Sequence, residues 1–343
     1  MNKREKNQWT HVGTIFAFNL LFSPILLAGT APNTISAAGI RASLTSVNAK
    51  VENKFIQKQT RPTSTHDLKD YESEPIIFGT FQRQKTDVSA NINGYHIKSG
   101  GVGYLLDYNF KTALDLFEIG GGATYAESHT NIATSDTLNS DYGQILGYAN
   151  LVENGYFLGL FLSRTESWSK SKRAISGTTL QALSRFKGAA FFSKVRIGHM
   201  SRQSDWQLIP EASLYYVHFH ESGRNETGAD ISNLSVSSSA ADGVKAGIGG
   251  RVMYIQPAVT TEIRAFYLRD LKNPLLNPSF TFSASGAPFA PSAQNNKKNN
   301  LNLGASLKYF VRPDLSITGV YDFLVKQQGY TENNASLLMC WNF

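Results

Sequence analysis

Two pairs of side chains have the types and spacing that could support chemistry. His199 and Ser201 lie two residues apart, so a β-strand would place a base and a hydroxyl nucleophile on one face, as in a lipid hydrolase. His218 and His220 share this spacing, roughly 6.6 Å along a strand, and Glu221 follows them. They could bind a metal ion if a third ligand shared their face. The alternative in both cases is that the histidines simply lie at a membrane interface and have no chemical role.

Two glycine-rich stretches, residues 100–103 and 120–122, invite comparison with a phosphate-binding loop. Such a loop must lie at the start of a helix, where backbone N–H groups face the phosphate. Both stretches instead lie in segments with a period of two, where glycine eases the bending of a strand. We therefore expect no nucleotide site in these stretches. For the chain as a whole we also expect no metal site, no cofactor and no catalytic residue.

The composition restricts the class of protein. Of 343 residues, 17% are charged and 12% are aromatic, and the mean hydropathy of −0.24 argues against a bundle of membrane-spanning helices. Low charge with many aromatic residues suits a β-barrel whose side chains face lipid and water in alternation. The net charge is +7, but no basic run is longer than residues 170–173, so nucleic acid is not an expected partner. Cys340, the single cysteine, has no partner for an internal disulfide and is expected to be a small buried residue.

The first residues predict export. A basic segment at 3–6 precedes an apolar stretch at 12–28, and small residues follow at 29–31 and 36–38. This pattern is typical of a Sec-type signal peptide, so we assign residues 1–38 to the signal, with cleavage near 31 or 38. Residues 39–73 form a polar segment. Apolar residues spaced by three and four favour a helix at 43–56, possible inside a pore, and a disordered tail is the alternative.

From residue 74 to residue 343 the hydrophobic pattern has a period of two, which indicates β-strands. In residues 243–254, Val244, Ile248 and Val252 fall on one side, and Lys245 and Arg251 fall on the other. The polar side of such segments carries many glycines, and aromatic residues bracket the apolar side. We therefore expect an all-β fold, a transmembrane barrel with lipid outside and water inside.

We expect twelve antiparallel strands, at residues 75–86, 95–109, 116–130, 137–151, 156–168, 184–200, 205–220, 236–254, 259–270, 298–311, 315–326 and 333–343. Connections after the even-numbered strands are short and those after the odd-numbered strands are mostly longer, as when periplasmic turns alternate with surface loops. An even number also lets the last strand pair with the first, which removes both sheet edges. His199 then lies near a periplasmic turn, away from the outer leaflet where a lipid hydrolase would act.

Strand parity predicts the charged residues of the interior: Glu211, Lys245, Arg251, Glu262, Arg264, Lys308 and Asp322. Two interpretations remain open. These residues line a water-filled lumen and pair with one another, or they also contact an inner helix and set the polarity of the pore. Their mixed signs predict no ion preference. Pro210 lies inside the seventh strand and cannot donate to a ladder, so we expect a bulge or an unpaired carbonyl there.

Residues 205–223 resemble part of the autotransporter β-domain, in which a tryptophan, a Leu-x-Pro and a Leu-x-Tyr precede an acidic loop. The matching residues are Trp206, Leu208, Pro210, Leu214 and Tyr216, followed by Glu221. The glycine-rich strand at 243–254 resembles the strand that follows in this family. The alternating C-terminal residues Leu337, Met339, Trp341 and Phe343 resemble the signal that the barrel-assembly machinery reads in outer-membrane proteins.

The resemblance implies a type V secretion translocator in the outer membrane of a Gram-negative bacterium, with a pore that holds a helix joined to an exported passenger. It implies outer-membrane lipid, the barrel-assembly machinery and periplasmic chaperones as partners. Residues 39–73 are too few for a β-helical passenger, so we expect little or no passenger. The alternative is that the chain is a fragment or a degenerate member of the family. Asn48 and Asn53 are separated, so we do not expect the cleavage that self-cleaving members of the family perform at an asparagine pair.

Two other functions remain as hypotheses. A surface barrel could bind a host or environmental partner through long loops such as 270–297, because loops held by a rigid scaffold often carry binding sites. An outer-membrane hydrolase built on His199 and Ser201 is the less favoured third hypothesis.

Overall fold

The structure is a computed structural model that describes residues 72–73, 76–87, 95–110, 116–132, 136–175, 178–272, 279–289, 299–312, 314–326 and 330–342. The predicted signal peptide and the predicted helix at 43–56 lie outside these residues, as does Phe343. No helix in the described part of the chain has the length and hydrophobicity needed to cross a membrane.

Twelve long antiparallel strands among the described residues form a closed barrel, which confirms the predicted fold. Each long strand pairs with the next, and the last pairs with the first from Thr331↔Asp87 to Asn342↔Ile76. The strands are β2 (Ile76–Asp87), β3 (Tyr95–Phe110), β4 (Leu116–Ile132), β5 (Asp136–Glu153), β6 (Tyr156–Ala174), β7 (Gln181–His199), β9 (Trp206–Glu221), β12 (Ser239–Ile255), β13 (Val259–Lys272), β16 (Asn299–Arg312), β17 (Leu315–Lys326) and β18 (Tyr330–Asn342).

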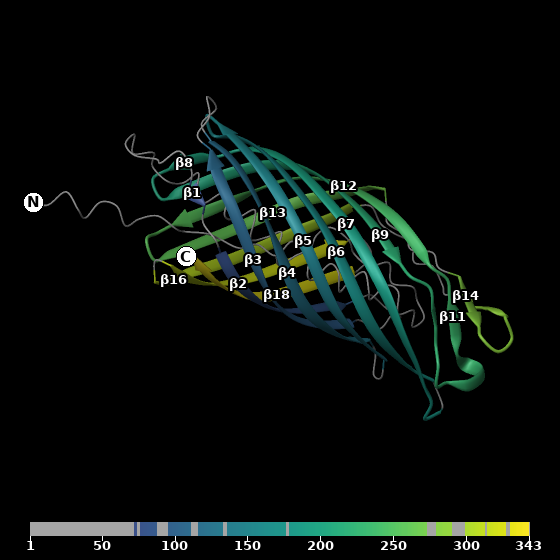
Figure 1. Ribbon diagram of the computed structural model, residues 1–343. Coiled ribbons are helices and arrows are strands. Elements are labelled where there is room, and N and C mark those ends of the chain that lie inside the picture. Colours follow the sequence, from purple (N-terminus) through teal and green to yellow (C-terminus); the bar gives the residue numbers. More distant parts are fainter. Residues whose placement is uncertain are drawn as a thin grey trace, which may run out of the picture.

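Short elements lie at the two ends of the barrel. Figure 1 shows β11 (Leu234–Val236) and β14 (Phe280–Phe282) beyond one end, with β1 (Glu72–Ser73) and β8 (Ser201–Gln203) at the other. β11 and β14 form a four-stranded sheet with β10 (Arg224–Asn225) and β15 (Pro288–Phe289). A 3-10 helix, η1 (Asp230–Ser232), precedes β11. We call these ends the long-loop end and the short-turn end.

The period-two pattern of the sequence becomes an outward and an inward face. On β12 the outward Ile248 is 64% exposed, whereas the inward Lys245 and Arg251 are 1% and 2% exposed. The same outward stripe of large hydrophobic side chains continues on the other long strands, and we call it the belt. A soluble sandwich would bury this stripe, so its exposure around a closed sheet is the pattern expected for contact with lipid.

Turn residues define the short-turn end. Asn154 and Gly155, between β5 and β6, have φ values of 50° and 80°. Positive φ at both central residues is typical of a type I′ turn, which the Asn-Gly sequence favours because its twist matches that of the strands.

The predicted contrast in loop length is weaker than expected, because several strands continue farther toward the long-loop end. β6 extends to Ala174, and only residues 133–135 separate β4 from β5. Inward serines support the extension of β6: Ser140 Oγ lies 2.8 Å from Ser169 Oγ, and Ser171 Oγ lies 2.6 Å from Ser184 Oγ. These pairs hold polar strands together where hydrophobic alternation has ended.

The interior contains hydrophobic as well as polar side chains. Val152, Phe157, Ile209 and Met253 form a buried cluster near the short-turn end. Aromatic rings also lie over inward glycines of a neighbouring strand. A Cβ on Gly120 would come within 2.3 Å of the Tyr148 ring. The glycines of β3 and β4 are therefore in strands, as expected, and some of them make room for aromatic rings.

Pro210 interrupts the ladder without a bulge, so the bulge we considered is absent. β7 pairs with β9 as far as Gly198↔Glu211, and β8 resumes at Ser201↔Leu208 in the same register. On its other side Pro210 stays in register with Gly250 of β12. The gap faces β7 because proline has no N–H to donate. Met200 N, beside this gap, donates to Gly155 O in the turn between β5 and β6 at 2.8 Å.

Candidate functional site: a charged band inside the barrel

The seven charged residues predicted for the interior are all buried on the face opposite the belt. They come from β9, β12, β13, β16 and β17, which are consecutive in the barrel. Lys194 and Arg196 of β7 and Asp270 of β13 extend the group. We call it the inner charge band: Lys194, Arg196, Glu211, Lys245, Arg251, Glu262, Arg264, Asp270, Lys308 and Asp322.

The carboxylate of Glu211 lies among three positively charged side chains. Arg251 Nη2 donates to Glu211 Oε2 at 2.8 Å. Lys194 Nζ lies 3.5 Å from Oε1, and Arg196 Nη1 lies 3.7 Å from Oε2. β7 and β12 flank β9, so the strand pairing brings cations to Glu211 from both sides. A single carboxylate therefore offsets the repulsion among three buried cations.

A second ion pair crosses a strand. Arg264 of β13 donates to Asp322 of β17, passing over Gly304 of β16. A Cβ on Gly304 would meet Arg264 Nε at 2.5 Å and Asp322 Oδ1 at 2.6 Å. Glycine is needed at this position because the ion pair occupies the space of a side chain.

The remaining members of the inner charge band differ in their contacts. Lys245 Nζ lies 3.1 Å from Asp270 Oδ1, and the two residues are register partners on β12 and β13. Glu262 is fully buried, and neither of its carboxylate oxygens has a hydrogen-bond partner in the described part of the chain. Lys308 Nζ lies 4.5 Å from the centroid of the Phe310 ring.

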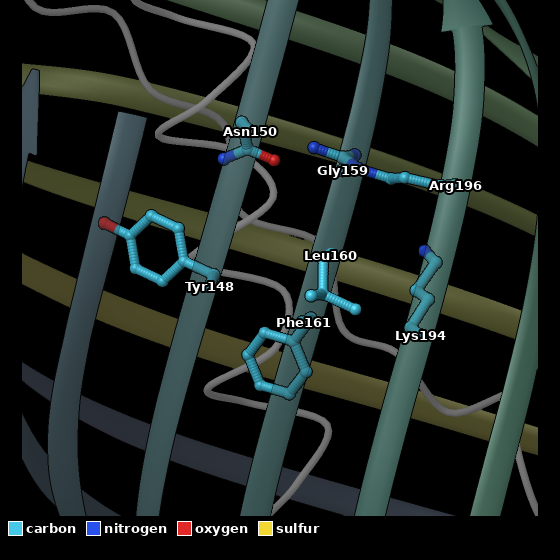
Figure 2. A pocket seen from close by; sticks show the side chains of 7 residues that line it. All are labelled: Tyr148, Asn150, Gly159, Leu160, Phe161, Lys194 and Arg196. Carbon is cyan, nitrogen blue, oxygen red and sulfur yellow. The ribbon is translucent and has the colours of Figure 1, made fainter. Parts of the chain in front are cut away.

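A small pocket lies at the edge of the inner charge band, between β5, β6 and β7, and Lys194 and Arg196 of the band line it (Figure 2). Arg196 reaches across Gly159 toward Asn150 in this view. A Cβ on Gly159 would come within 2.9 Å of Arg196 Nε and 2.8 Å of Asn150 Oδ1. Asn150 Nδ2 donates to Glu118 Oε2 at 2.9 Å. Polar side chains thus continue from the band as far as β4.

Sequence reasoning missed Lys194, Arg196 and Asp270, although the signal was present. Lys194 and Arg196 alternate with Val195 and Ile197, both outward and exposed, and this alternation marks the cations as inward. Asp270 continues the inward parity of Glu262 and Arg264 along β13.

The residues that resemble the family pattern lie on the outward face of β9. Trp206, Leu208, Pro210, Leu214 and Tyr216 are all exposed. The Trp206 ring lies 4.8 Å from the Tyr254 ring of β12 at the short-turn end. Leu337, Met339 and Trp341 are also outward, on β18, and Trp341 Nε1 donates to Asp314 Oδ2 at 2.9 Å.

The two histidine pairs take part in different contacts. His199 packs on Tyr156, with ring centroids 4.5 Å apart, and no hydrogen bond joins it to Ser201 in the part of the chain described. His218 Nδ1 lies 2.8 Å from Asp242 Oδ1. The described residues contain no group of three side chains suited to a metal ion.

Comparison with known proteins identifies the family. The model for the autotransporter beta-domain matches residues 76–322. A comparison with curated protein sequences found no match.

Three solved structures share the fold. The translocator domain of autotransporter NalP from Neisseria meningitidis has a TM-score of 0.64 at 12% identity, covering 90% of this chain and 98% of that chain. The beta domain of the Bordetella autotransporter BrkA has a TM-score of 0.57 at 14% identity, covering 79% and 99%. The transport unit of the autotransporter AIDA-I from Escherichia coli has a TM-score of 0.54 at 14% identity, covering 84% and 97%. With a closed twelve-stranded barrel, an outward belt and a family match over most of its length, the chain belongs to the autotransporter β-domain family of outer-membrane barrels.

Proposed function

We propose that this barrel is a translocator that passes the segment preceding β2 across the outer membrane. The observation that supports the proposal is the inner charge band, a group of buried and mostly paired charges inside a closed barrel. Charges in the interior favour a hydrated passage over a dry core. The proposed role of the seven predicted residues is to line that passage.

The balance of charge in the band fits a passage for polypeptide. Six cations face the carboxylates of Glu211, Glu262, Asp270 and Asp322, and additional inward acids lie at Glu118 and Glu332. A wall with mixed signs attracts neither sign strongly, so a chain of varied sequence can pass without being held. We further propose that residues 39–71, which precede β1, occupy the passage after export and restrict it.

A surface-display experiment tests the proposal. An epitope inserted after residue 42 is expected to become accessible to antibody and protease on intact cells. The matched control carries the same epitope in the turn after Asn154, which is expected to remain inaccessible because short turns face the periplasm. An epitope at residue 42 that becomes accessible only after the outer membrane is opened would contradict export.

Binding of a surface partner is the second candidate function, supported by ordered structure at the long-loop end. Glu226 holds the connection between β9 and β12: Arg173 Nε donates to Glu226 Oε1 at 3.1 Å, and Leu234 N donates to Oε2 at 2.9 Å. The sheet of β10, β11, β14 and β15 follows, with Leu234, Val236 and Phe280 in its own small core. Ile231 in η1 is 72% exposed.

This second function has a separate test. Deleting residues 279–289 removes β14 and β15 without changing a barrel strand. Adhesion of expressing cells to a host-cell or matrix surface should fall while the residue 42 epitope is still displayed. Unchanged adhesion would exclude this sheet as the binding surface.

A further inference from the structure

Four cations form an exposed patch on the outside of the barrel. Lys170 and Lys172 of β6 and Arg185 and Lys187 of β7 all point outward and are exposed. They lie toward the long-loop ends of these strands, on the same face as the belt. We call this group the rim patch.

Strand pairing places like charges opposite each other in the rim patch. Lys170 is the register partner of Arg185, and Trp168 is the register partner of Lys187. Cations directly opposite each other on one face of a sheet repel and destabilise the pair. An anion between them would convert this repulsion into attraction.

The described residues provide no carboxylate partner for the rim patch. None of its four cations forms an ion pair within the described ranges, although outward cations elsewhere on the barrel do. Arg164 Nη2 lies 3.0 Å from Glu166 Oε1, and Lys272 Nζ lies 2.9 Å from Asp242 Oδ2. The positive charge of the rim patch is therefore not offset by a direct ion pair within the described residues.

The rim patch adjoins the belt at the height of lipid headgroups. Along β7, moving from the short-turn end toward the long-loop end, the outward residues Ile197, Val195 and Phe191 come first, and Lys187 and Arg185 come after them. On β6 the outward Trp168, 45% exposed, directly precedes Lys170. Tryptophan is typical of the boundary between hydrocarbon and headgroups. Long loops face the cell exterior in such barrels, so the patch faces the outer leaflet.

We propose that the rim patch binds the phosphate groups of a phosphorylated glycolipid in the outer leaflet. Lysine and arginine are the usual ligands of phosphate, because their N–H groups form charge-assisted hydrogen bonds to its oxygens. Their aliphatic stems can lie along the upper part of the acyl chains while the charged groups reach the headgroup. The inference depends on the outer-membrane location and orientation, and is independent of whether the barrel translocates a polypeptide.

Native mass spectrometry of the purified barrel with bis-phosphorylated lipid A tests the proposal. The test variant combines Lys170→Gln, Arg185→Gln and Lys187→Gln. The matched control combines Arg269→Gln, Lys272→Gln and Arg312→Gln, which remove the same charge from exposed sites outside the patch. We expect the test variant to lose lipid A occupancy about tenfold, since each cation near an anionic surface contributes measurably to binding. The control should retain the occupancy of the wild type.

Two further arms identify the group that is bound. Lipid A without its phosphates is expected to bind wild type and test variant equally weakly, and inorganic phosphate at equal concentration is expected not to displace lipid A. Both variants must migrate as folded barrels before heating. Equal loss in the control variant, or undiminished binding by the test variant, would overturn the proposal. So would equal binding of the dephosphorylated lipid to the wild type, or displacement of lipid A by free phosphate.

Discussion

At the scale of single residues, Glu211 is the position where one change should have the largest effect on the inner charge band. Glu211→Gln keeps the shape of the side chain but leaves Lys194, Arg196 and Arg251 buried without their shared anion. Removing one member of a buried ion pair costs about 3 kcal/mol. We expect a loss of this size in urea unfolding in lipid vesicles, followed by tryptophan fluorescence.

Glu262→Gln is the matched control for Glu211→Gln. Glu262 is equally buried but has no hydrogen bond or ion pair among the described residues. Removing a charge that lacks a direct partner should leave stability unchanged or raise it. If both variants lose the same stability, then the three contacts of Glu211 do not explain its effect.

Gly249 provides a second residue-scale prediction, because its neighbour strand is too close for a side chain. A Cβ there would lie 2.2 Å from the backbone oxygen of Ala265, which cannot rotate away. Gly249→Ala should reduce stability by about 2 kcal/mol through displacement of β12 from β13. Gly319→Ala is the control, since a Cβ at Gly319 meets no atom within 4 Å. Similar unfolding midpoints for the two variants would contradict this account of the close approach.

At the scale of elements, the terminal strand β18 should be needed for assembly beyond its contribution to the belt. Leu337 and Met339 are each 53% exposed and lie on the strand that closes the barrel. Replacing both with serine should reduce the amount of folded barrel in outer membranes several-fold. Heat-modifiable migration on gels measures the folded fraction.

A pair on another strand separates an assembly signal from simple hydrophobicity. Leu301 and Leu303 on β16 have comparable exposure, 43% and 42%, and the same double change to serine. If β18 carries the recognition signal, the β16 variant should assemble much better than the β18 variant. An equal reduction in both would mean that only contact with lipid matters.

The long strands could be predicted from the sequence because the barrel imposes one physical rule on every one of them. Outward residues such as Ile248 face hydrocarbon and inward residues such as Lys245 do not, so hydrophobic and polar residues alternate along each strand with a period of two. The rule fails where both faces meet water. The extension of β6 to Ala174 and the sheet containing β11 and β14 were therefore not foreseen.

The ion-pair partners inside the barrel could not be predicted from the sequence, for a related reason. Parity identified Glu211 and Arg251 as inward, but parity does not specify the stagger between strands. Which cation reaches Glu211 depends on that stagger and on glycines such as Gly159 and Gly304, over which long side chains cross. Lys194 and Arg196 could have been found by the same parity rule.

At the scale of the whole molecule, the closed sheet separates two environments. The belt faces outward on all sides, and the inner charge band lies within, so the barrel can remain in a membrane while holding polar groups away from lipid. Among the twelve described long strands of the barrel no edge is left unpaired, because β18 closes on β2. A translocator needs these properties, and the rim patch would add a fixed contact with the surrounding lipid.

Single-channel conductance in planar bilayers, compared for the full mature chain and a variant lacking residues 41–70, shows whether the barrel contains a passage that its own N-terminal segment restricts. Both proteins must first show the gel shift of a folded barrel. We expect small or infrequent openings for the mature chain and a stable, larger conductance for the deletion variant, because the charged passage would no longer be restricted. A folded deletion variant that stays as closed as the mature chain would contradict this expectation.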